Sequence, residues 1–336
     1  MKHVFITLTF LIGCLFPLVV LAQDATTMKA IQLQAFGGPE VLEVHELPIP
    51  VPGDGEILLR VRAAAINPVD TGVRAGRAAS LAGAVPPYVP GFDVSGTVAA
   101  IGQGVTGFSV GDHVFAMLDL RRGGGYAEYT IVKKNEAAMK PRRVTHSQAA
   151  SIPLVALTAW QTLFDVADLQ EGQTVLIHAG AGGVGSIAIQ LAKWRGARVI
   201  ATASEYNHDF LRELGADVAV DYRTQRFEDF ASDIDVVLDT VGGETQVRSM
   251  TVLREGGTLI SIVGLTPQGR NPQRDINVSS ILVRPDSEQL SRIGELIEND
   301  IVRPIVNYRF PLHRAPEAHE QSETRRSRGK IVLELD

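Results

Sequence analysis

From residue 28 onward, short runs of mixed apolar and polar residues are separated by Gly and Pro. The segments KAIQLQAF, LEVHELPIP and GEILLRVRAAAIN predict β-strands, and DVSGTVAAIGQGV, GDHVFAM and YAEYTIVK continue the same pattern. The pattern extends to about residue 150. It predicts a β-rich, partly open, barrel-like domain at the start of the fold.

The pattern then changes. The segment SQAASIPLVALTAWQTLFDVA predicts a helical stretch, and after it apolar strands alternate with amphipathic helices, from QTVLIHAG and GVGSIAIQLAKWRG to GGTLISIVG. The strands are nearly continuous runs of Val, Ile and Leu, which is typical of a parallel sheet covered on both faces. The fold class is therefore α/β, with a doubly wound parallel (Rossmann) sheet.

The last strands, RPIVNYRFPL and KIVLELD, are similar in style to the first domain. We therefore expect the chain to return to that domain at its end. The predicted organisation is a β-rich catalytic domain from residues 28–151 and 285–336, with a dinucleotide-binding domain inserted at 152–284.

The first 22 residues have the three parts of a signal peptide: a positive start at Lys2, an apolar run, and a small-residue cleavage site after Ala22. This predicts export to the periplasm or the medium. Two alternatives stay open. In the first, the chain is anchored in the membrane, by a lipid on Cys14 in LIGC or by an uncleaved leader. In the second, translation begins at Met28 and the protein is cytoplasmic.

Composition narrows the chemistry. The 336 residues carry a net charge of -6 and no basic block, which disfavours nucleic acid as a main partner. Cys14 is the only cysteine in the sequence and lies in the leader. A chain cleaved after Ala22 therefore has no thiol for disulfides, nucleophilic catalysis or metal ligation.

A glycine-rich turn is the strongest motif. Gly180, Gly182 and Gly185 fit G-x-G-x-x-G between an apolar strand and an amphipathic helix, with Gly183 and Val184 inside the turn. We assign Gly180 to the tight turn, Gly182 to the close approach of a pyrophosphate, and Gly185 to helix–strand packing. The alternative is a turn of the same kind without a ligand.

The end of the second Rossmann strand indicates the cofactor. Ser204 stands where an Asp or Glu would bind the 2'-hydroxyl of NAD, so NADP(H) is favoured. Tyr222 and Arg223 follow the third strand and are predicted to reach the same phosphate. The alternative for this pair is an ordinary exposed loop.

Many segments in the right order carry a family resemblance, among them INPVDTGVRAG, VPGFDVSGTVAAIG, LTAW, AGAGGVG, VLDTVGG and RGKIVLEL. From Met28 to the end, the chain resembles the zinc-independent quinone oxidoreductase branch of the medium-chain dehydrogenase/reductases, the group that includes zeta-crystallin. The resemblance implies a GroES-like catalytic domain. The chain departs from relatives that carry a Lys after the strand-end Ser, because here the stretch is SEYNH.

The resemblance also implies site residues. It places Asn67 near the nicotinamide and substrate with Asp70 behind it, and Thr158 against the nicotinamide ring. Val241, Gly264 and Leu265 are expected to line the cofactor crevice at the ends of later strands. The alternatives are a capped turn at Asn67 and, at Thr158, a hydroxyl bonded to its own helix.

We therefore predict an NADPH-dependent reductase that transfers hydride, without a metal, to a quinone or an α,β-unsaturated carbonyl. No general acid stands out: Tyr88, Arg74 and His178 are assigned structural roles, and water delivers the proton. The alternatives are a non-catalytic NADP(H)-binding scaffold or stress protein and a zinc alcohol dehydrogenase. The apolar segment 276–283 predicts a homodimer.

Overall fold

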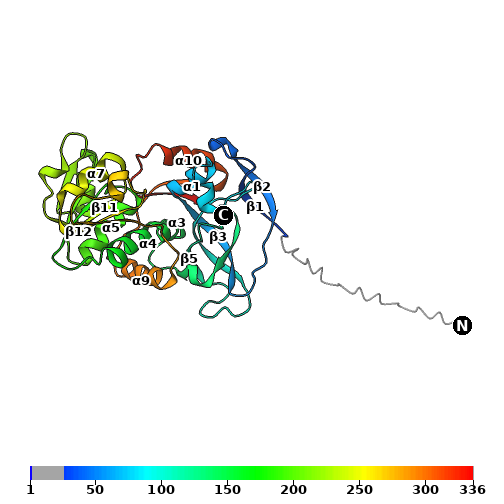
Figure 1. The fold of residues 1–336 in the computed structure, drawn as a ribbon. Coiled ribbons are helices and arrows are strands. Elements are labelled where there is room, and N and C mark those ends of the chain that lie inside the picture. The colour runs from blue at the N-terminus through cyan, green and yellow to red at the C-terminus, as the bar shows by residue number, and fades with distance from the viewer. Residues whose placement is uncertain (2–25, 336) are drawn as a thin grey trace.

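The computed structural model describes Met1 and residues 26–335, so the predicted signal peptide, apart from Met1, lies outside the described residues. The chain forms two lobes (Figure 1). One lobe is built on a seven-stranded sheet and the other on a six-stranded parallel sheet. The predicted fold class, α/β with a doubly wound parallel sheet beside a β-rich domain, is confirmed.

The six-stranded sheet belongs to the cofactor lobe. Its strands lie in the order β10 (Val218–Asp221), β9 (Arg198–Ala203), β8 (Thr174–Ile177), β11 (Ile234–Asp239), β12 (Leu253–Ser261) and β13 (Asn277–Ser280). The chain runs outward from β8 in one direction through β9 and β10, and in the other through β11 to β13. The order therefore reverses between β8 and β11, where ligands of such sheets bind outside the carboxyl ends of the strands.

Alternation along the strands covers both faces of this sheet. On β8, Val175 and Ile177 pack into one apolar cluster, whereas Leu176 packs into another. Successive strand residues point to opposite faces, so each strand feeds two cores. The helices of this lobe that cover the faces are α5 (Gly183–Trp194), α6 (His208–Glu213), α7 (Gly243–Val252) and α8 (Pro267–Arg270).

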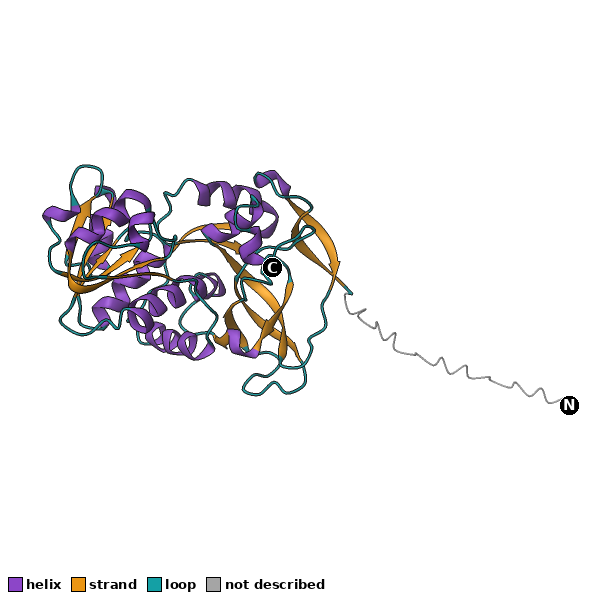
Figure 2. Cartoon of the chain, in the orientation of Figure 1, coloured by secondary structure: helices purple, strands orange, loops and turns teal. Residues whose placement is uncertain are grey.

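The other lobe is organised around the long strand β3 (Glu56–Ile66). Its sheet also contains β4 (Asp93–Ile101), β5 (His113–Met117), β6 (Tyr129–Lys133), β7 (Ala137–Met139), β14 (Val306–Pro311) and β15 (Lys330–Glu334), and beside it lies the hairpin of β1 (Thr27–Leu33) and β2 (Leu42–Pro48). Figure 2 shows the strands of this lobe and the helices around them. Two short helices, α1 (Pro68–Arg74) and α2 (Ala79–Ala82), follow β3.

The end of the chain joins the two lobes. After α9 (Ser287–Glu298) and α10 (Ala315–Glu323), strand β15 pairs antiparallel with β3. The segment before β15, residues 325–329, is here named the crossing segment. The backbone N–H of Gly329, the last residue of this segment, donates to the Ala181 carbonyl oxygen (2.8 Å). Gly329 also forms an isolated β-bridge with Gly182. The C-terminal strand therefore starts directly beside the glycine-rich turn.

The helical stretch that the sequence predicts from residue 147 onward is divided into three pieces. These are α3 (His146–Ala150), α4 (Pro153–Trp160) and a π-helical turn, Gln161–Val166. The break precedes Pro153, which lacks an N–H and is tolerated only in the first turn of a helix. Single 3-10 turns occur at Pro39–Val41, Lys134–Glu136, Glu205–Asn207, Phe227–Asp229 and Leu312–Arg314.

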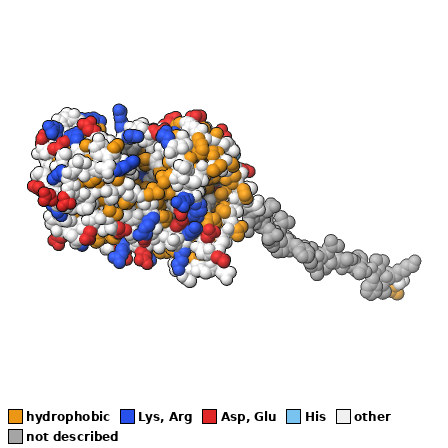
Figure 3. All heavy atoms as spheres, in the orientation of Figure 1, with side chains coloured by type: hydrophobic (Ala, Val, Ile, Leu, Met, Phe, Trp, Pro, Cys, Tyr) orange, Lys and Arg blue, Asp and Glu red, His pale blue; other side chains and the backbone are white. Residues whose placement is uncertain are grey.

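Cationic and anionic side chains are interspersed on the face of the molecule that Figure 3 shows. Among the helices of residues 26–335, none has both the length and the apolar character needed to cross a membrane.

Candidate functional site

The glycine-rich turn connects β8 to α5, as predicted, but Gly180 acts differently from the sequence assignment. The left-handed residue of the turn is Ala179 (φ 49°), and Gly180 does not have a positive φ. A Cβ on Gly180 would lie 2.5 Å from the side chain of Leu211, and one on Gly185 would lie 2.5 Å from the Ala179 carbonyl oxygen. The assignment of Gly180 to the tight turn was wrong, because Ala179 takes the left-handed conformation and Gly180 instead allows close packing against Leu211; Gly185 allows close packing, as predicted.

The middle of the turn fits the diphosphate of a dinucleotide. A Cβ on Gly182 would meet only the Ala179 oxygen, at 3.3 Å, so this face of the backbone is open. Gly182 is the N-cap of α5 and, within the described residues, no side chain caps this helix. The N–H groups of Gly183, Val184 and Gly185 begin the helix and have no intrahelical acceptor. Three donors and the positive end of the helix dipole therefore face an open surface, which suits an anion.

The tip of β9 brings together the residues predicted to bind the 2'-phosphate. Ser204 follows the strand directly, and the Tyr222 N–H donates to the Ala203 carbonyl oxygen (3.2 Å). Arg223 Nε lies 3.4 Å from the Tyr222 hydroxyl, and both side chains are exposed. Three of the predicted residues therefore lie at one corner of the sheet.

The later strand ends form a second corner around a buried carboxylate. Asp239, at the end of β11, accepts from the N–H of Val241 (3.0 Å). It also accepts from the Gln246 side chain (2.8 Å), whose amide donates to the Gly264 carbonyl oxygen (2.9 Å). Val241 and the Gly264–Leu265 loop are thus tied together at the carboxyl edge of the sheet, where they were predicted to lie.

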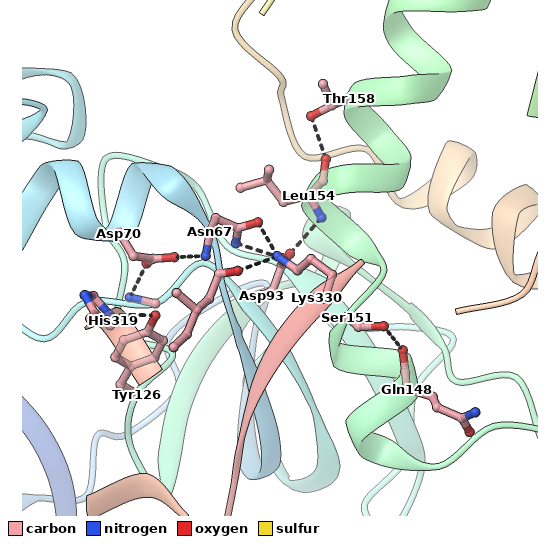
Figure 4. Close-up of polar contacts among 12 residues, drawn as sticks. Asn67, Asp70, Asp93, Tyr126, Gln148, Ser151, Leu154, Thr158, His319 and Lys330 are labelled. Carbon is pink, nitrogen blue, oxygen red and sulfur yellow. Dashed lines mark hydrogen bonds and ion pairs between the residues drawn. The ribbon is translucent and has the colours of Figure 1, made fainter. Parts of the chain in front are cut away.

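The Asn67 and Asp70 side chains lie in a fully buried network between the lobes (Figure 4). The Asp70 carboxylate accepts from the Asn67 backbone N–H (2.7 Å). The Asn67 amide donates to Asp93 Oδ2 (2.9 Å) and accepts from Lys330 Nζ. The Lys330 ammonium also donates to the Ile66 carbonyl oxygen (2.7 Å) and lies 3.5 Å from Asp93 Oδ2.

Asp93 and Lys330 are members of this network that sequence reasoning missed. Asp93 joins the lobes, because its Oδ1 accepts from the N–H of Leu154 at the start of α4 (2.7 Å). Lys330 reaches the glycine-rich turn, since a Cβ on Gly183 would lie 3.0 Å from Lys330 Cδ. The sequence places these residues in the motifs VPGFDVSG and RGKIVLEL, but it gave neither a role in the site. The network thus connects the NPVD turn to the phosphate-binding turn.

Burial dominates the protonation of the network. It raises the pKa of Asp70 to about 7, although donors from Asn67 and Gly91 and the charge of Lys330 oppose the rise. Burial also raises the pKa of the Asp93 carboxyl and lowers that of the Lys330 ammonium, and the attraction between these two groups opposes both shifts. The Asp70 carboxyl therefore keeps its proton to higher pH than an exposed carboxyl does.

Thr158 has the geometry of the alternative interpretation. Its hydroxyl donates to the Leu154 carbonyl oxygen one turn earlier in α4 (2.6 Å), and the side chain is buried. A contact with the nicotinamide ring stays a prediction.

The environments of the three side chains considered as proton donors favour structural roles for them. Burial lowers the pKa of His178 to about 4, so its ring is neutral between two hydroxyl groups. Arg74 is buried and pairs with Glu323 (2.7 Å). Burial raises the pKa of Tyr88 well above its usual value, with a further contribution from Asp70.

The donor set at the predicted site does not resemble a zinc centre. Asn67, Asp70 and Asp93 engage Lys330 and backbone N–H groups. Within residues 26–335, no three His, Cys, Asp or Glu side chains are grouped so that they could hold a metal ion.

The chain matches two family models. Residues 53–142 match the alcohol dehydrogenase GroES-like domain, and residues 214–333 match a family described as zinc-binding dehydrogenase.

Two similar proteins and one similar solved structure are quinone or alkenal/one oxidoreductases. The chain is 34% identical, over 91% of its length and 79% of the relative's, to the chloroplastic NADPH-dependent alkenal/one oxidoreductase of Arabidopsis thaliana. It is 31% identical to the quinone oxidoreductase of Sus scrofa, over 94% of this chain and all of that one. The structure of the quinone oxidoreductase from Coxiella burnetii is similar with a TM-score of 0.86 and 36% identity, over 92% of this chain and all of that one.

Proposed function

The chain belongs to the zinc-independent quinone oxidoreductase branch of the medium-chain dehydrogenase/reductases, and from this membership we propose that it is an NADPH-dependent reductase of quinones or α,β-unsaturated carbonyls. The observation that carries the proposal is the contact between the two halves of the site. The open glycine-rich turn lies beside Lys330, which holds the Asn67 side chain. Cofactor and substrate regions are therefore connected at the junction of the lobes.

In this proposal the residues of the chain bind the cofactor and orient the acceptor. The N–H groups at the start of α5 would hold the diphosphate, and Ser204, directly after β9, would face the 2'-phosphate. When bound, NADPH supplies the hydride. The buried network fixes the NPVD turn beside the junction, so the acceptor is positioned against a rigid surface. Water supplies the proton to the oxygen that gains charge.

The network supports a reduction that needs no metal. Lys330 donates to the Asn67 amide oxygen and lies 3.5 Å from Asp93 Oδ2, so the chain's own cation already partners these oxygen ligands. A metal assay of the purified protein tests this point. Stoichiometric zinc that is required for activity would contradict this point and would support a zinc alcohol dehydrogenase instead.

Steady-state oxidation of NADPH with 1,2- and 1,4-quinones, alkenals and alkenones tests the proposal. We expect turnover with at least one of these acceptors. Tight binding of NADPH without turnover on any of them would instead support the non-catalytic scaffold. The same screen with NADH measures the cofactor preference.

We also propose a homodimer through residues 276–283. Among residues 26–335, β13 is one of the two edge strands of its sheet and pairs only with β12. Leu282, beyond the strand, is 57% exposed. Sedimentation of the wild type is expected to show a dimer that Leu282→Glu weakens, and a monomeric wild type would contradict the proposal.

Export by the N-terminal signal peptide is a further proposal, supported by the pattern of residues 1–22. N-terminal sequencing of the native protein, together with cell fractionation, tests it. A new N-terminus at Gln23 supports export. An intact or lipid-bearing leader would indicate anchoring, and a start at Met28 would indicate a cytoplasmic protein.

A further inference from the structure

The loop after β9 lacks the lysine that some relatives carry, but the structure brings a cation to it from the far end of the chain. Arg328, in the crossing segment, donates from Nε to Asn207 Oδ1 (2.6 Å) and from a terminal nitrogen to the Tyr206 carbonyl oxygen (2.8 Å). These acceptors lie 121 and 122 residues away in the sequence. The guanidinium is therefore part of the wall at the predicted 2'-phosphate position.

Aromatic rings hold this guanidinium in place. Its central carbon lies 4.3 Å from the ring centroid of Tyr206 and 5.4 Å from that of Phe210. Cation–π contacts at such distances stabilise one orientation of an arginine. The side chain thus loses little conformational freedom when an anion binds, which favours binding.

The contact with Arg328 also sets the direction of the next hydrogen bond. A guanidinium can only donate, so it fixes the Asn207 amide with its oxygen toward Arg328. The amide nitrogen then faces Ser204 Oγ and donates to it (3.1 Å). Among the described residues, no acceptor takes a hydrogen bond from the Ser204 hydroxyl. Its proton is therefore available for a phosphate oxygen.

The crossing segment ties this arrangement to the phosphate-binding turn. Gly329, the neighbour of Arg328, donates to Ala181 (2.8 Å) and bridges to Gly182. The position of the guanidinium relative to the diphosphate site is thus fixed by backbone contacts. Arg223, by contrast, is exposed, and among the described residues its hydrogen bonds and ring contact involve only its neighbours Tyr222 and Asp221.

We propose that Arg328 is the specificity-determining residue for the 2'-phosphate of NADPH. It supplies positive charge and, through Asn207, directs the Ser204 proton toward the phosphate. This inference rests on the proposed function, because it concerns the cofactor of the same site. Arg223 has a secondary role.

Binding of two nucleotides to the purified protein, measured by titration calorimetry, tests the inference without turnover. The probes are 2',5'-ADP, which carries the 2'-phosphate, and 5'-AMP, which lacks it. We expect Arg328→Met to weaken 2',5'-ADP by about 10- to 100-fold, as for the loss of charged hydrogen bonds. Binding of 5'-AMP should change by less than about 2-fold.

Three further variants sharpen the test. Arg328→Lys should keep part of the preference, since it retains the charge. Arg326→Met is the matched control, because it removes one exposed charge from the same segment. Asn207→Asp keeps a partner for Arg328 but cannot donate to Ser204, and it should also lower the preference for 2',5'-ADP.

Two outcomes would overturn the inference. Equal losses for both probes in Arg328→Met would show that Arg328 only holds the loop together, and an unchanged preference would show that it does not contact the phosphate. In either case a wild type that binds 2',5'-ADP and turns over leaves the proposed function intact. A wild type that binds neither probe would overturn the inference and the cofactor assignment together.

Discussion

Replacement of Lys330 by methionine is the sharpest test of the buried network. Methionine keeps most of the side-chain length and removes the charge. In the folded protein Lys330 is 5% exposed and Asp93 is 0% exposed, and their charged atoms lie 3.5 Å apart. The substitution therefore leaves a carboxylate buried without its cation.

The expected loss in the free energy of unfolding follows from the distance between the two charges. Two unit charges at this separation attract by about 5 kcal/mol at an effective dielectric constant of ~20. Removal of one partner of a buried pair typically costs about 3–5 kcal/mol. We expect Lys330→Met to lower the free energy of unfolding by this amount at neutral pH. The loss should shrink in acid, because the Asp93 carboxyl, whose pKa burial raises, can then take up a proton.

Urea unfolding followed by far-UV circular dichroism measures the effect. Adding Asp93→Asn to Lys330→Met should recover at least half of the loss, since the unpaired charge is gone. Lys134→Met is the matched control: its ammonium bonds the Thr106 hydroxyl at an exposed site, so the change should be within about 0.5 kcal/mol. A loss below about 1 kcal/mol for Lys330→Met, or additive losses in the double variant, would refute the reasoning.

Three further predictions concern the glycine-rich turn and the network. Gly182→Ala should leave stability within about 1 kcal/mol of wild type but weaken 2',5'-ADP at least about 10-fold, because its Cβ enters the open anion site. Gly185→Ala should destabilise the fold by about 1–3 kcal/mol, since its Cβ would lie 2.7 Å from Gly180 Cα; an equally stable variant would contradict the packing argument. Because burial raises the pKa of Asp70 to about 7, the wild type should lose stability as pH rises toward this value and the buried carboxyl ionises. Asp70→Asn cannot ionise, so its free energy of unfolding should rise relative to wild type over this range, by up to about 1.4 kcal/mol per pH unit. Unfolding curves across this range that differ by a constant would refute that assignment.

The sequence predicted those parts of the fold that depend on local patterns. Continuous apolar strands and amphipathic helices indicated the doubly wound sheet, and the turn at Gly180–Gly185 indicated the anion site. The detailed role of Gly180 was wrong because backbone angles and the position of Leu211 are not visible in a motif. The break before Pro153 was missed because both flanking segments are helical in pattern.

The parts of the site that were missed depend on contacts between distant segments. Lys330 reaches Asn67 across 263 residues, and Arg328 reaches Asn207 across 121. Periodicity identifies elements but does not say which loop meets which. The sequence could thus indicate that a cation was missing after Ser204, but it could not show that the crossing segment supplies one.

Hydride transfer from NADPH to an acceptor of the proposed classes is the central claim. It is tested most directly by anaerobic single-turnover mixing of the enzyme with NADPH deuterated at the nicotinamide C4 position and a quinone or enone. The account predicts oxidation of NADPH that is slowed by deuterium in one of the two C4 positions only. Nucleotide that binds but is not oxidised by any acceptor, in a correctly folded protein, would contradict it.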